Sequence, residues 1–524
     1  MRNTRDEIWN QLDRPWDLII IGGGITGAGI LREAVRVGYR ALLVEGHDFA
    51  SGTSSRSSKL VHGGLRYLKN AQIKMTLESV REREKLLKDA RGLITRLGFL
   101  YANLKGDSIP GWVFRAGLMV YDLLAGQMSH RAYDAMDMRE LCPPLTTPDL
   151  RGGYRYFDAQ TDDARLVLRV LQTATREGGV ALNYARVENL LRDQAGQVRG
   201  VVLRDQAPDG QGRTAEVKAT VVVNAAGPWA DELRMQIGQP RRLRALRGSH
   251  LVIPPERLPL TRAVTFLHPE DGRPVFAIPW EGVTIFGTTD VDHGRELQTD
   301  PKISEAETGY LLRALQKAFP AQELTRADVQ ATWAGIRSVV DTGRSPSKES
   351  REHVIWLENG LLTVSGGKLT TFRLMARDAL NTVRHLLPDK PEPTDFSWAV
   401  GDLVEILQGL GPLISPVGLR LAGRYHVHAP ALVSAARPEE LSPIADLPFL
   451  WAELRWAARA EAVVHLDDLL LRRVRLGLVL PGGGLREMAQ IRGIVQPELG
   501  WEDGRWAAEV RGYETLWRGV YGPD

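Results

Sequence analysis

The stretch DLIIIGGGITGAGILREAVRVGYRALLVE, residues 17–45, decides the fold of this chain. It begins with an apolar run that is typical of a parallel strand buried on both faces. Small and apolar side chains then recur at helical spacing over residues 25–37, and Gly38 predicts the end of that helix. The run ALLVE, residues 41–45, predicts a second strand and completes a βαβ unit of about 30 residues. The chain therefore opens with a nucleotide-binding fold.

Three glycines lie at the turn between the first strand and the helix. Gly22, Gly24 and Gly27 form the pattern G-x-G-x-x-G, and Glu45 ends the next strand. The first glycine permits the tight turn, the second lets the backbone approach a pyrophosphate, and the third allows the helix to pack closely. Glu45 is spaced to accept hydrogen bonds from a ribose. The pattern predicts a dinucleotide site and leaves FAD and NAD as alternatives.

The composition excludes several classes of protein. With 524 residues, of which 43% are hydrophobic, the chain can bury a sizeable core in about three structural units. The net charge of +3 is small and dispersed, so nucleic acid is not an expected partner. The single cysteine, Cys142, can form neither an intrachain disulfide nor a cysteine-rich metal site, and no metal is expected. Residues 1–16 contain no apolar stretch of signal-peptide length, so the expected location is the cytoplasm.

The most lipid-like segment is GWVFRAGLMVYDLLAG, residues 111–126. Arg115 and Asp122 interrupt it and leave far fewer than the roughly 20 apolar residues that a spanning helix requires. A helix buried in the core is the simpler interpretation. The alternative is an aromatic-rich helix that lies peripherally on the inner face of the cell membrane.

Later segments predict the remaining architecture. The strand TVVVNAAG, residues 220–227, ends in small residues, as strands do where they meet a ligand crevice. Short strand candidates at His250, Pro274 and Val283 favour a mostly antiparallel substrate domain. After about residue 390 the pattern becomes helical. The positions expected on one helix face are Leu454, Ala458, Ala462, Leu466 and Leu470.

The segment ASGTSSRSSKLVHGGLRYL, residues 50–68, directly follows the expected ribose-binding strand. Its hydroxyls and backbone N–H groups can hold a second part of an extended cofactor. Lys59, His62, Arg66 and Tyr67 add three potentially cationic groups and a phenol. Such a density of polar groups is unusual in a purely structural loop.

Together these motifs resemble the FAD-dependent glycerol-3-phosphate dehydrogenases. GGGITGAGI and the hydroxyl-rich segment are followed in order by NAAGPW at Asn224, FGTTD at Phe286, GIR at residues 335–337 and GGKLTTFR at Gly366. The C-terminal region also resembles the cap domain of that family. The resemblance implies a D-amino-acid-oxidase type of flavoprotein fold, with FAD as cofactor. It also implies oxidation of sn-glycerol 3-phosphate to dihydroxyacetone phosphate by hydride transfer to flavin N5, with quinone as electron acceptor.

The patterns along the sequence also predict a division of the chain. A Rossmann-like α/β FAD-binding domain would comprise residues 1–90, 151–240 and 336–390. A helical and loop insertion with a candidate membrane-facing segment would occupy residues 91–150, and the substrate domain residues 241–335. A C-terminal helical cap domain would comprise residues 391–524. The oligomeric state stays open, a homodimer included.

Cofactor roles carry over only to the matching positions. The glycine turn and Glu45 would hold the ADP part of FAD, and Arg186 and Val187 in YARVENL would lie near adenine. A helix would begin at residues 366–370 under the flavin pyrimidine, where the helix dipole favours negative charge on the ring. The implied cofactor-binding residues are Gly22, Gly24, Ile25, Thr26, Gly27, Glu45, Thr53, Ser54, Ser57, Lys59, Arg186, Val187, Gly227, Gly366, Gly367, Lys368, Leu369 and Thr370.

The substrate pocket implied by the resemblance contains Arg66, Tyr67, Arg337 and Lys368. A phosphate with a charge of about −1.5 to −2 needs several donors. Among the expected catalytic residues His62, Arg337 and Lys368, His62 is the candidate base, because a neutral imidazole accepts a proton near pH 7. Arg337 stays protonated and would stabilise the phosphate or a developing alkoxide. The alternative is that His62 only hydrogen-bonds the loop or the flavin.

Other functions remain open at this point. A glycerol-3-phosphate oxidase would share the motifs but reduce oxygen to hydrogen peroxide. A noncatalytic flavin sensor would need no convergent cations, and an amino-acid or amine oxidase would favour a carboxylate clamp. One stretch, LITRLGFLYANLKGDSIPGWVF at residues 93–114, departs from the proline-rich, histidine-containing passage common in the family. The wall that this stretch forms is therefore in doubt.

Overall fold

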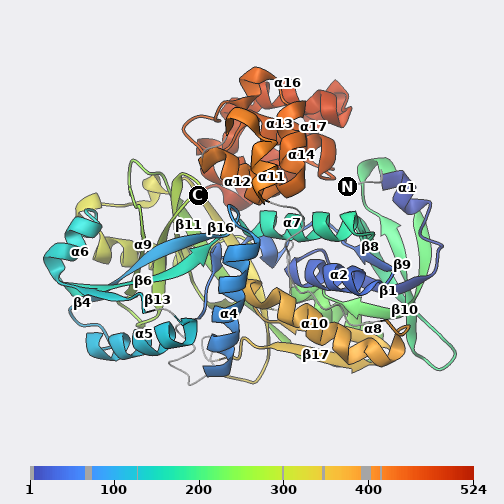
Figure 1. Ribbon diagram of the computed structural model, residues 1–524, viewed down its shortest axis with the longest axis horizontal. Helices are drawn as coiled ribbons and strands as arrows, with labels where there is room; N and C mark the ends of the chain where they lie inside the picture. The colour runs from blue at the N-terminus through green and yellow to red at the C-terminus, as the bar shows by residue number, and fades with distance from the viewer. Residues whose placement is uncertain are drawn as a thin grey trace.

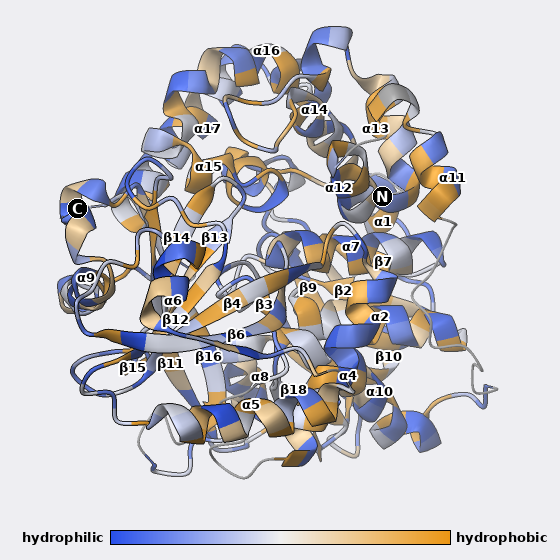
Figure 2. Cartoon of the chain, turned by 60° about the vertical axis from the view of Figure 1, so that its left-hand side comes forward, coloured by the Kyte–Doolittle hydropathy of each residue, from blue (hydrophilic) through white to orange (hydrophobic). Residues whose placement is uncertain are grey.

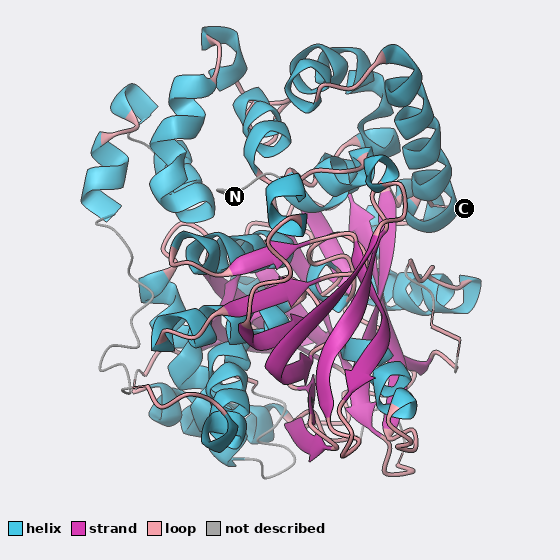
Figure 3. Cartoon of the chain, turned by 90° about the vertical axis from the view of Figure 1, so that its right-hand side faces the viewer, coloured by secondary structure: helices cyan, strands magenta, loops and turns pink. Residues whose placement is uncertain are grey.

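The computed structural model describes residues 5–64, 73–126, 128–294, 296–297, 300–344, 349–390, 403–413 and 416–523. Two sheets lie beside each other, and the C-terminal helices gather on one side of both (Figure 1). Seen from another direction, the strands lie in the middle of the molecule with helices around them (Figure 3).

The first sheet contains the predicted nucleotide-binding unit. In the described residues its strand order is β17-β18-β10-β1-β2-β7, and β9 and β8 extend it beyond β10. Strand β1 pairs in parallel with β2 and β10, so Ile20 lies between Leu43 and Val223. The strands are β1 (Trp16–Ile21), β2 (Ala41–Val44), β7 (Val180–Leu182), β8 (Ala185–Arg192), β9 (Val198–Asp205), β10 (Thr214–Asn224), β17 (His353–Glu358) and β18 (Leu361–Gly366).

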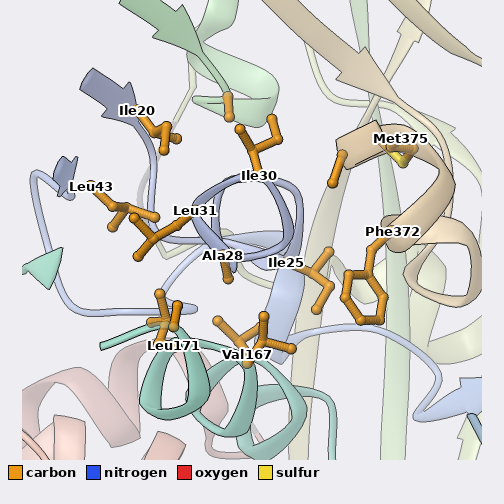
Figure 4. Packing of buried hydrophobic residues seen from close by; sticks show 14 of the residues in the cluster. Ile20, Ile25, Ala28, Ile30, Leu31, Leu43, Val167, Leu171, Phe372 and Met375 are labelled. Atoms are coloured by element: carbon orange, nitrogen blue, oxygen red, sulfur yellow. The ribbon is translucent and has the colours of Figure 1, made fainter. Parts of the chain in front are cut away.

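Helix α2 (Ile25–Val37) follows β1 over the predicted residues and ends at Gly38 in a left-handed conformation. It packs between α7 (Asp163–Arg176) and α10 (Phe372–Val383). Figure 4 shows Val167 and Leu171 of α7 and Phe372 of α10 around α2 in this core. Because α2 is apolar on most of its faces, it is stable only when other elements cover it.

The second sheet is mostly antiparallel. Its order in the described residues is β15-β11-β14-β13-β12-β4-β6-β3, with β16 paired to β11 and β5 paired to β6. The pairs β11·β14 and β13·β14 are antiparallel, as the sequence predicts. The strands are β3 (Leu60–Val61), β4 (Thr95–Leu104), β5 (Arg131–Tyr133), β6 (Leu150–Gln160), β11 (Leu243–Ile253), β12 (Ala263–Leu267), β13 (Pro274–Trp280), β14 (Val283–Gly287), β15 (Val291–Asp292) and β16 (Ala331–Val340).

Three predicted domain boundaries do not follow these sheets. Strand β4 lies inside the segment 91–150, which the sequence assigned to a helical and loop insertion, yet it pairs with β6 and β12 of the second sheet. Strand β6 lies in a segment assigned to the FAD-binding domain, and β16 straddles residue 336, where the substrate domain was expected to end. The sheet to which each of these strands belongs is determined by pairing with strands far away in sequence. The local sequence pattern does not predict such pairing.

The helices cover the sheets and form a separate C-terminal cluster. Helices α11 to α17 form that cluster, beside the ends of both sheets (Figure 1). The remaining helical bounds are α1 (Arg5–Trp9), α4 (Ile73–Asp89), α5 (Gly111–Ala125), α6 (Ala135–Leu141), α8 (Ala230–Gln236), α9 (Glu305–Ala318), α11 (Leu403–Gln408), α12 (Pro416–Tyr425), α13 (Ala429–Ala435), α14 (Trp451–Ala460), α15 (Leu476–Val479), α16 (Met488–Leu499) and α17 (Asp503–Leu516).

The single helix face expected from Leu454 to Leu470 is wrong. Helix α14 ends at Ala460, Ala462 has a left-handed φ of +51°, and a π-helical segment, Asp468–Arg473, follows. Leu454 and Leu470 nevertheless share one apolar core, because the chain turns back on itself between them. Four-residue spacing alone does not distinguish one helix from two packed segments.

Helix α5 is not the core helix that was the simpler interpretation of residues 111–126. Only Leu118, Tyr121 and Asp122 are buried, whereas Trp112 is 73% and Leu123 76% exposed. Apolar positions of α5 lie along the lower edge of the molecule in Figure 2. No helix in the described part of the chain is long and apolar enough to cross a bilayer.

Candidate functional site

One cavity of about 1760 Å³ lies between the two sheets. Its first wall includes Gly22, Glu45 and Val364 at the carboxyl ends of β1, β2 and β18, and its second wall includes Tyr156 and Phe276. Ligands of open α/β sheets bind beyond the carboxyl ends of the strands. A pocket for a drug-sized ligand measures about 300 to 1,000 Å³. This cavity can therefore hold a dinucleotide and a small substrate together.

Two of the three glycines in the turn leave no room for a side chain. Gly22 has a φ of +113°, and a Cβ there would lie within 3.0 Å of Ala225 O. A Cβ on Gly27 would collide with Gly22 O, whereas one on Gly24 would meet only Ser54 Oγ, at 3.0 Å. The first turn of α2 contains no acidic residue. The turn therefore offers backbone N–H groups and a helix N-terminus to an anion.

Glu45 lies beside this turn and lines the cavity. Its two carboxylate oxygens accept hydrogen bonds from Gly23 N (2.6 Å) and His47 N (2.8 Å). Burial raises the pKa of Glu45, and these two hydrogen bonds oppose that shift. Arg186 and Val187, at the start of β8, line the same end of the cavity. The predicted ribose and adenine residues are thus brought together.

The hydroxyl-rich loop divides into cavity-facing and buried parts. Thr53, Ser54 and Ser57 line the cavity. Thr53 Oγ1 donates to Ile336 O of the second sheet, and Ser54 Oγ accepts from Ile25 N at 2.9 Å. Lys59 is fully buried, and the described cavity wall does not include it. The prediction that Lys59 lines the cofactor loop therefore needs a correction, because its amine is directed into the protein at Asp163.

Asp158 holds the VHGG loop that contains His62. Its Oδ1 accepts hydrogen bonds from Gly63 N (3.0 Å), Arg83 Nη1 (2.8 Å) and the Tyr121 hydroxyl (3.1 Å). Burial raises the pKa of Asp158, and the charge of Arg83 opposes that shift. His62 lines the cavity, as does Asp158. The loop is therefore bound to strand β6 and to helices α4 and α5.

The GGKLT segment reaches the same region from the first sheet. Gly366 and Gly367 both have left-handed φ values, +74° and +77°, and α10 begins only at Phe372 after one 3-10 turn. Lys368 Nζ donates to Ser79 Oγ at 3.0 Å, and Thr370 Oγ1 donates to His62 O at 3.3 Å. All five residues from Gly366 to Thr370 line the cavity.

Arg337 lies on the opposite wall. Its Nη1 is 3.2 Å from Asp290 Oδ1, and its Nη2 donates to Thr288 Oγ1 at 3.2 Å. Arg351 binds the other oxygen of Asp290 at 2.7 Å. One carboxylate therefore holds two guanidinium groups at the cavity.

Sequence reasoning missed Arg351 and Asp290. Asp290 is the last residue of the FGTTD motif that the resemblance used, so its position was available as a signal. Arg351 lies outside every recognised motif, and only the pairing of β17 with β18 brings it near the cavity. Its Nε is buried and has no acceptor within the described residues. Arg66 and Tyr67, the other predicted substrate residues, lie outside the described residues.

The residues present fit FAD. In the glycine turn a Cβ on Gly22 or Gly27 would strike backbone, Glu45 offers carboxylate oxygens, and the cavity continues from there to residues 366–370. Gly227 also lines this path. The described residues contain no group of three His, Cys, Asp or Glu side chains arranged to hold a metal ion.

Comparisons with known proteins agree with this geometry. A family model described as FAD dependent oxidoreductase matches residues 17–379, and one described as the C-terminal domain of alpha-glycerophosphate oxidase matches residues 404–506. An aerobic glycerol-3-phosphate dehydrogenase of Staphylococcus aureus (strain USA300) is 36% identical over 486 residues, which cover 87% of this chain and 86% of the relative.

Two solved structures are similar to the chain. The glycerol-3-phosphate dehydrogenase of Bacillus halodurans, complexed with FAD, has a TM-score of 0.79 at 30% identity and covers 99% of this chain and 98% of its own. The L-alpha-glycerophosphate oxidase of Mycoplasma pneumoniae has a TM-score of 0.58 at 17% identity, over 74% of this chain and 98% of its own. The second likeness concerns the fold alone.

Proposed function

The chain belongs to the FAD-dependent oxidoreductases and, among them, to the aerobic glycerol-3-phosphate dehydrogenases, and from this premise we propose that it oxidises sn-glycerol 3-phosphate to dihydroxyacetone phosphate. The protein is an enzyme with FAD as its cofactor and a D-amino-acid-oxidase type of fold. The observation that supports the substrate best is the pair of arginines, Arg337 and Arg351, on one carboxylate at the cavity wall opposite the glycine turn.

Cationic side chains from two segments of this chain would bind the substrate. Arg337 and Lys368 would bind the phosphate from two different segments, because a doubly charged anion in a closed site needs more than one donor. Asp290 would keep Arg337 and its neighbour Arg351 oriented toward the cavity. A neutral glycerol has no charged group for these cations to bind, which favours the phosphorylated substrate.

Bound FAD supplies the hydride acceptor for the C2 hydrogen of the alcohol. The proton of the C2 hydroxyl needs a separate acceptor, and a ring nitrogen of His62 would take it. Asp158, through the N–H of Gly63, would hold the His62 loop during this transfer. Arg337 remains charged throughout and would stabilise the oxygen as negative charge develops on it.

Quinone is the acceptor that we assign to the second half of the reaction. The support is helix α5, which lines the cavity with Val113, Phe114 and Val120 and exposes Trp112 and Leu123 by more than 70%. Such a helix can lie in a membrane interface and bring the cavity close to a lipid-soluble acceptor. The enzyme would then be a cytoplasmic protein bound peripherally to the inner face of the membrane.

Turnover with defined donors and acceptors tests this function. We expect the purified holoenzyme to reduce a soluble quinone with glycerol 3-phosphate, and to use glycerol far less well. Equal specificity constants for the two donors would refute phosphate recognition. Stoichiometric hydrogen peroxide without quinone reduction would instead assign the chain to the oxidases, whose C-terminal family model matches it.

A further inference from the structure

The C-terminal helical cluster contacts the cofactor loop through buried charges. Arg475, at the start of α15, donates from Nη2 to Asp163 Oδ1 (2.7 Å) and to Ser55 O (3.0 Å). The side chains of Arg475 and Asp163 are 1% and 0% exposed. Ser55 belongs to the loop that lines the cavity with Thr53, Ser54 and Ser57. A residue more than 400 positions away in sequence therefore binds this loop directly.

Asp163 connects Arg475 to the cavity. Its Oδ2 accepts hydrogen bonds from Ser57 N (3.0 Å) and Ser57 Oγ (2.7 Å). The hydroxyl proton of Ser57 is therefore used inside the protein, and Ser57 Oγ also accepts from Lys59 N at 3.0 Å. Asp163 therefore binds both Ser57 and Lys59 from inside the protein.

Arg475 is the constant counter-charge of Asp163. Lys59 Nζ also binds Asp163, at 2.9 and 3.0 Å, but burial and the charge of Arg475 lower the pKa of Lys59 to about 7. A guanidinium stays charged at any pH that proteins encounter. A buried carboxylate without a partner charge would be strongly disfavoured, so Asp163 depends on Arg475.

The backbone of Arg475 supports a positioning role. Its φ of +67° lies in the left-handed region that side chains with a Cβ rarely adopt. Such conformations persist where the surrounding structure determines them, and they cluster at sites with a functional demand. The same cluster makes a second contact, because Arg473 binds Asp48, three residues beyond Glu45, at 2.6 and 2.8 Å.

We infer that Arg475 is a positioning residue for FAD: through Asp163 and Ser57 it holds the loop of residues 53–57 in the shape that binds the cofactor. The C-terminal cluster is then part of the cofactor site, although none of its residues lines the described cavity wall. This inference rests on the proposed role of the loop in FAD binding.

A double-mutant cycle on the holoenzyme tests the inference. The FAD dissociation constant is measured from flavin fluorescence for wild type, Arg475→Gln, Ser57→Ala and the double variant. We expect Arg475→Gln to raise this constant about 10- to 100-fold, since it removes hydrogen bonds to a charged group. The double variant should bind FAD nearly as well as Arg475→Gln alone, because both changes break one chain of contacts.

Arg455→Gln is the matched control. Arg455 is also a buried arginine of the C-terminal cluster and binds Glu440 at 2.6 Å and Glu498, but the described residues show no bond from it to the cofactor loop. We expect its melting temperature to fall while its affinity for FAD changes by less than twofold.

Three results would overturn the inference. Arg475→Gln with unchanged FAD affinity would make Arg475 merely structural, and so would equal losses in Arg475→Gln and Arg455→Gln. Effects of Arg475→Gln and Ser57→Ala that multiply would show that Ser57 contacts FAD independently. If Arg475→Gln does not fold, the cycle is run with Arg475→Lys, which keeps the charge. Failure of the proposed function is distinct, because wild type would then bind FAD but show no turnover with glycerol 3-phosphate.

Discussion

The two walls of the cavity contact a ligand by different means. The wall from the first sheet contains a turn of glycines. A Cβ added to Gly22 or Gly27 in this turn would overlap a backbone oxygen. The wall from the second sheet and its helices uses charged side chains such as Arg337, held by Asp290. The first wall should therefore be sensitive to atoms that are added, and the second to atoms that are removed.

The largest effect is expected from adding atoms to the first wall. Gly27→Val should give protein without flavin, since even a Cβ at this position overlaps Gly22 O. The ratio of flavin to protein absorbance measures this directly. Gly493→Ala is the control, because a Cβ there meets nothing within 4 Å. Gly24→Ala should keep the fold, since its Cβ meets only the Ser54 side chain, but should lose flavin because the added carbon lies where the backbone approaches the pyrophosphate. Full flavin content in Gly27→Val would contradict the expectation that the first wall is sensitive to added atoms.

Removal of the candidate base on the second wall should give the next largest effect. His62→Gln keeps a polar side chain of similar size but cannot accept the substrate proton. We expect anaerobic flavin reduction, followed by stopped-flow absorbance, to slow by about 10²- to 10⁴-fold, the usual range for general-base catalysis. The FAD content should be that of wild type. A rate within a few-fold of wild type across the pH range would make His62 a structural residue.

Removal of one cation should have a smaller effect. Arg337→Gln should lower kcat/KM for glycerol 3-phosphate by roughly 10- to 150-fold, the cost of about 1.5 to 3 kcal/mol for a charged hydrogen bond. Activity with glycerol should fall less, because with that donor only the stabilisation of the C2 oxygen is lost. Arg257→Gln, which breaks a comparable pair with Asp328 away from the cavity, is the control. An equal loss with both donors would show that Arg337 does not recognise phosphate.

The smallest effect concerns the outer face of the second wall. Leu123→Glu, on the exposed side of α5, should lower partitioning onto lipid vesicles by about tenfold, because a Leu side chain contributes about 1.5 to 3 kcal/mol when it leaves water. Turnover with a water-soluble acceptor should not change. Val404→Glu alters another exposed apolar residue, in the C-terminal cluster, and should leave vesicle binding unchanged. Equal binding by Leu123→Glu and wild type would contradict a membrane role for α5.

The same contrast explains what the sequence could predict. Strands β1 and β2, helix α2 and Gly38 were predicted within a residue of their bounds, because local periodicity and turn chemistry specify them within 29 residues. The antiparallel character of β11, β13 and β14 was also predicted. The membership of β4 and β6 in the second sheet was not, since it depends on pairing with strands far away in sequence.

Side-chain partners were the least predictable part of the site. Lys59 has a cationic side chain of the kind that can bind a cofactor, yet its amine binds Asp163, which lies 104 residues further along the chain. For helix α5 the sequence left a core helix and a surface helix as alternatives, and only its tertiary neighbours decide that its outer face stays uncovered. Arg351 has no motif around it. In each case the decisive fact is a tertiary neighbour and not a local pattern.

The central claim is that one cavity brings FAD on the first wall and glycerol 3-phosphate on the second wall into contact. Anaerobic titration of the oxidised holoenzyme with glycerol 3-phosphate, followed by flavin absorbance, tests it most directly. We expect complete bleaching at about one equivalent of substrate, with no bleaching by the same amount of glycerol. A flavin that stays oxidised in the presence of excess glycerol 3-phosphate would contradict it.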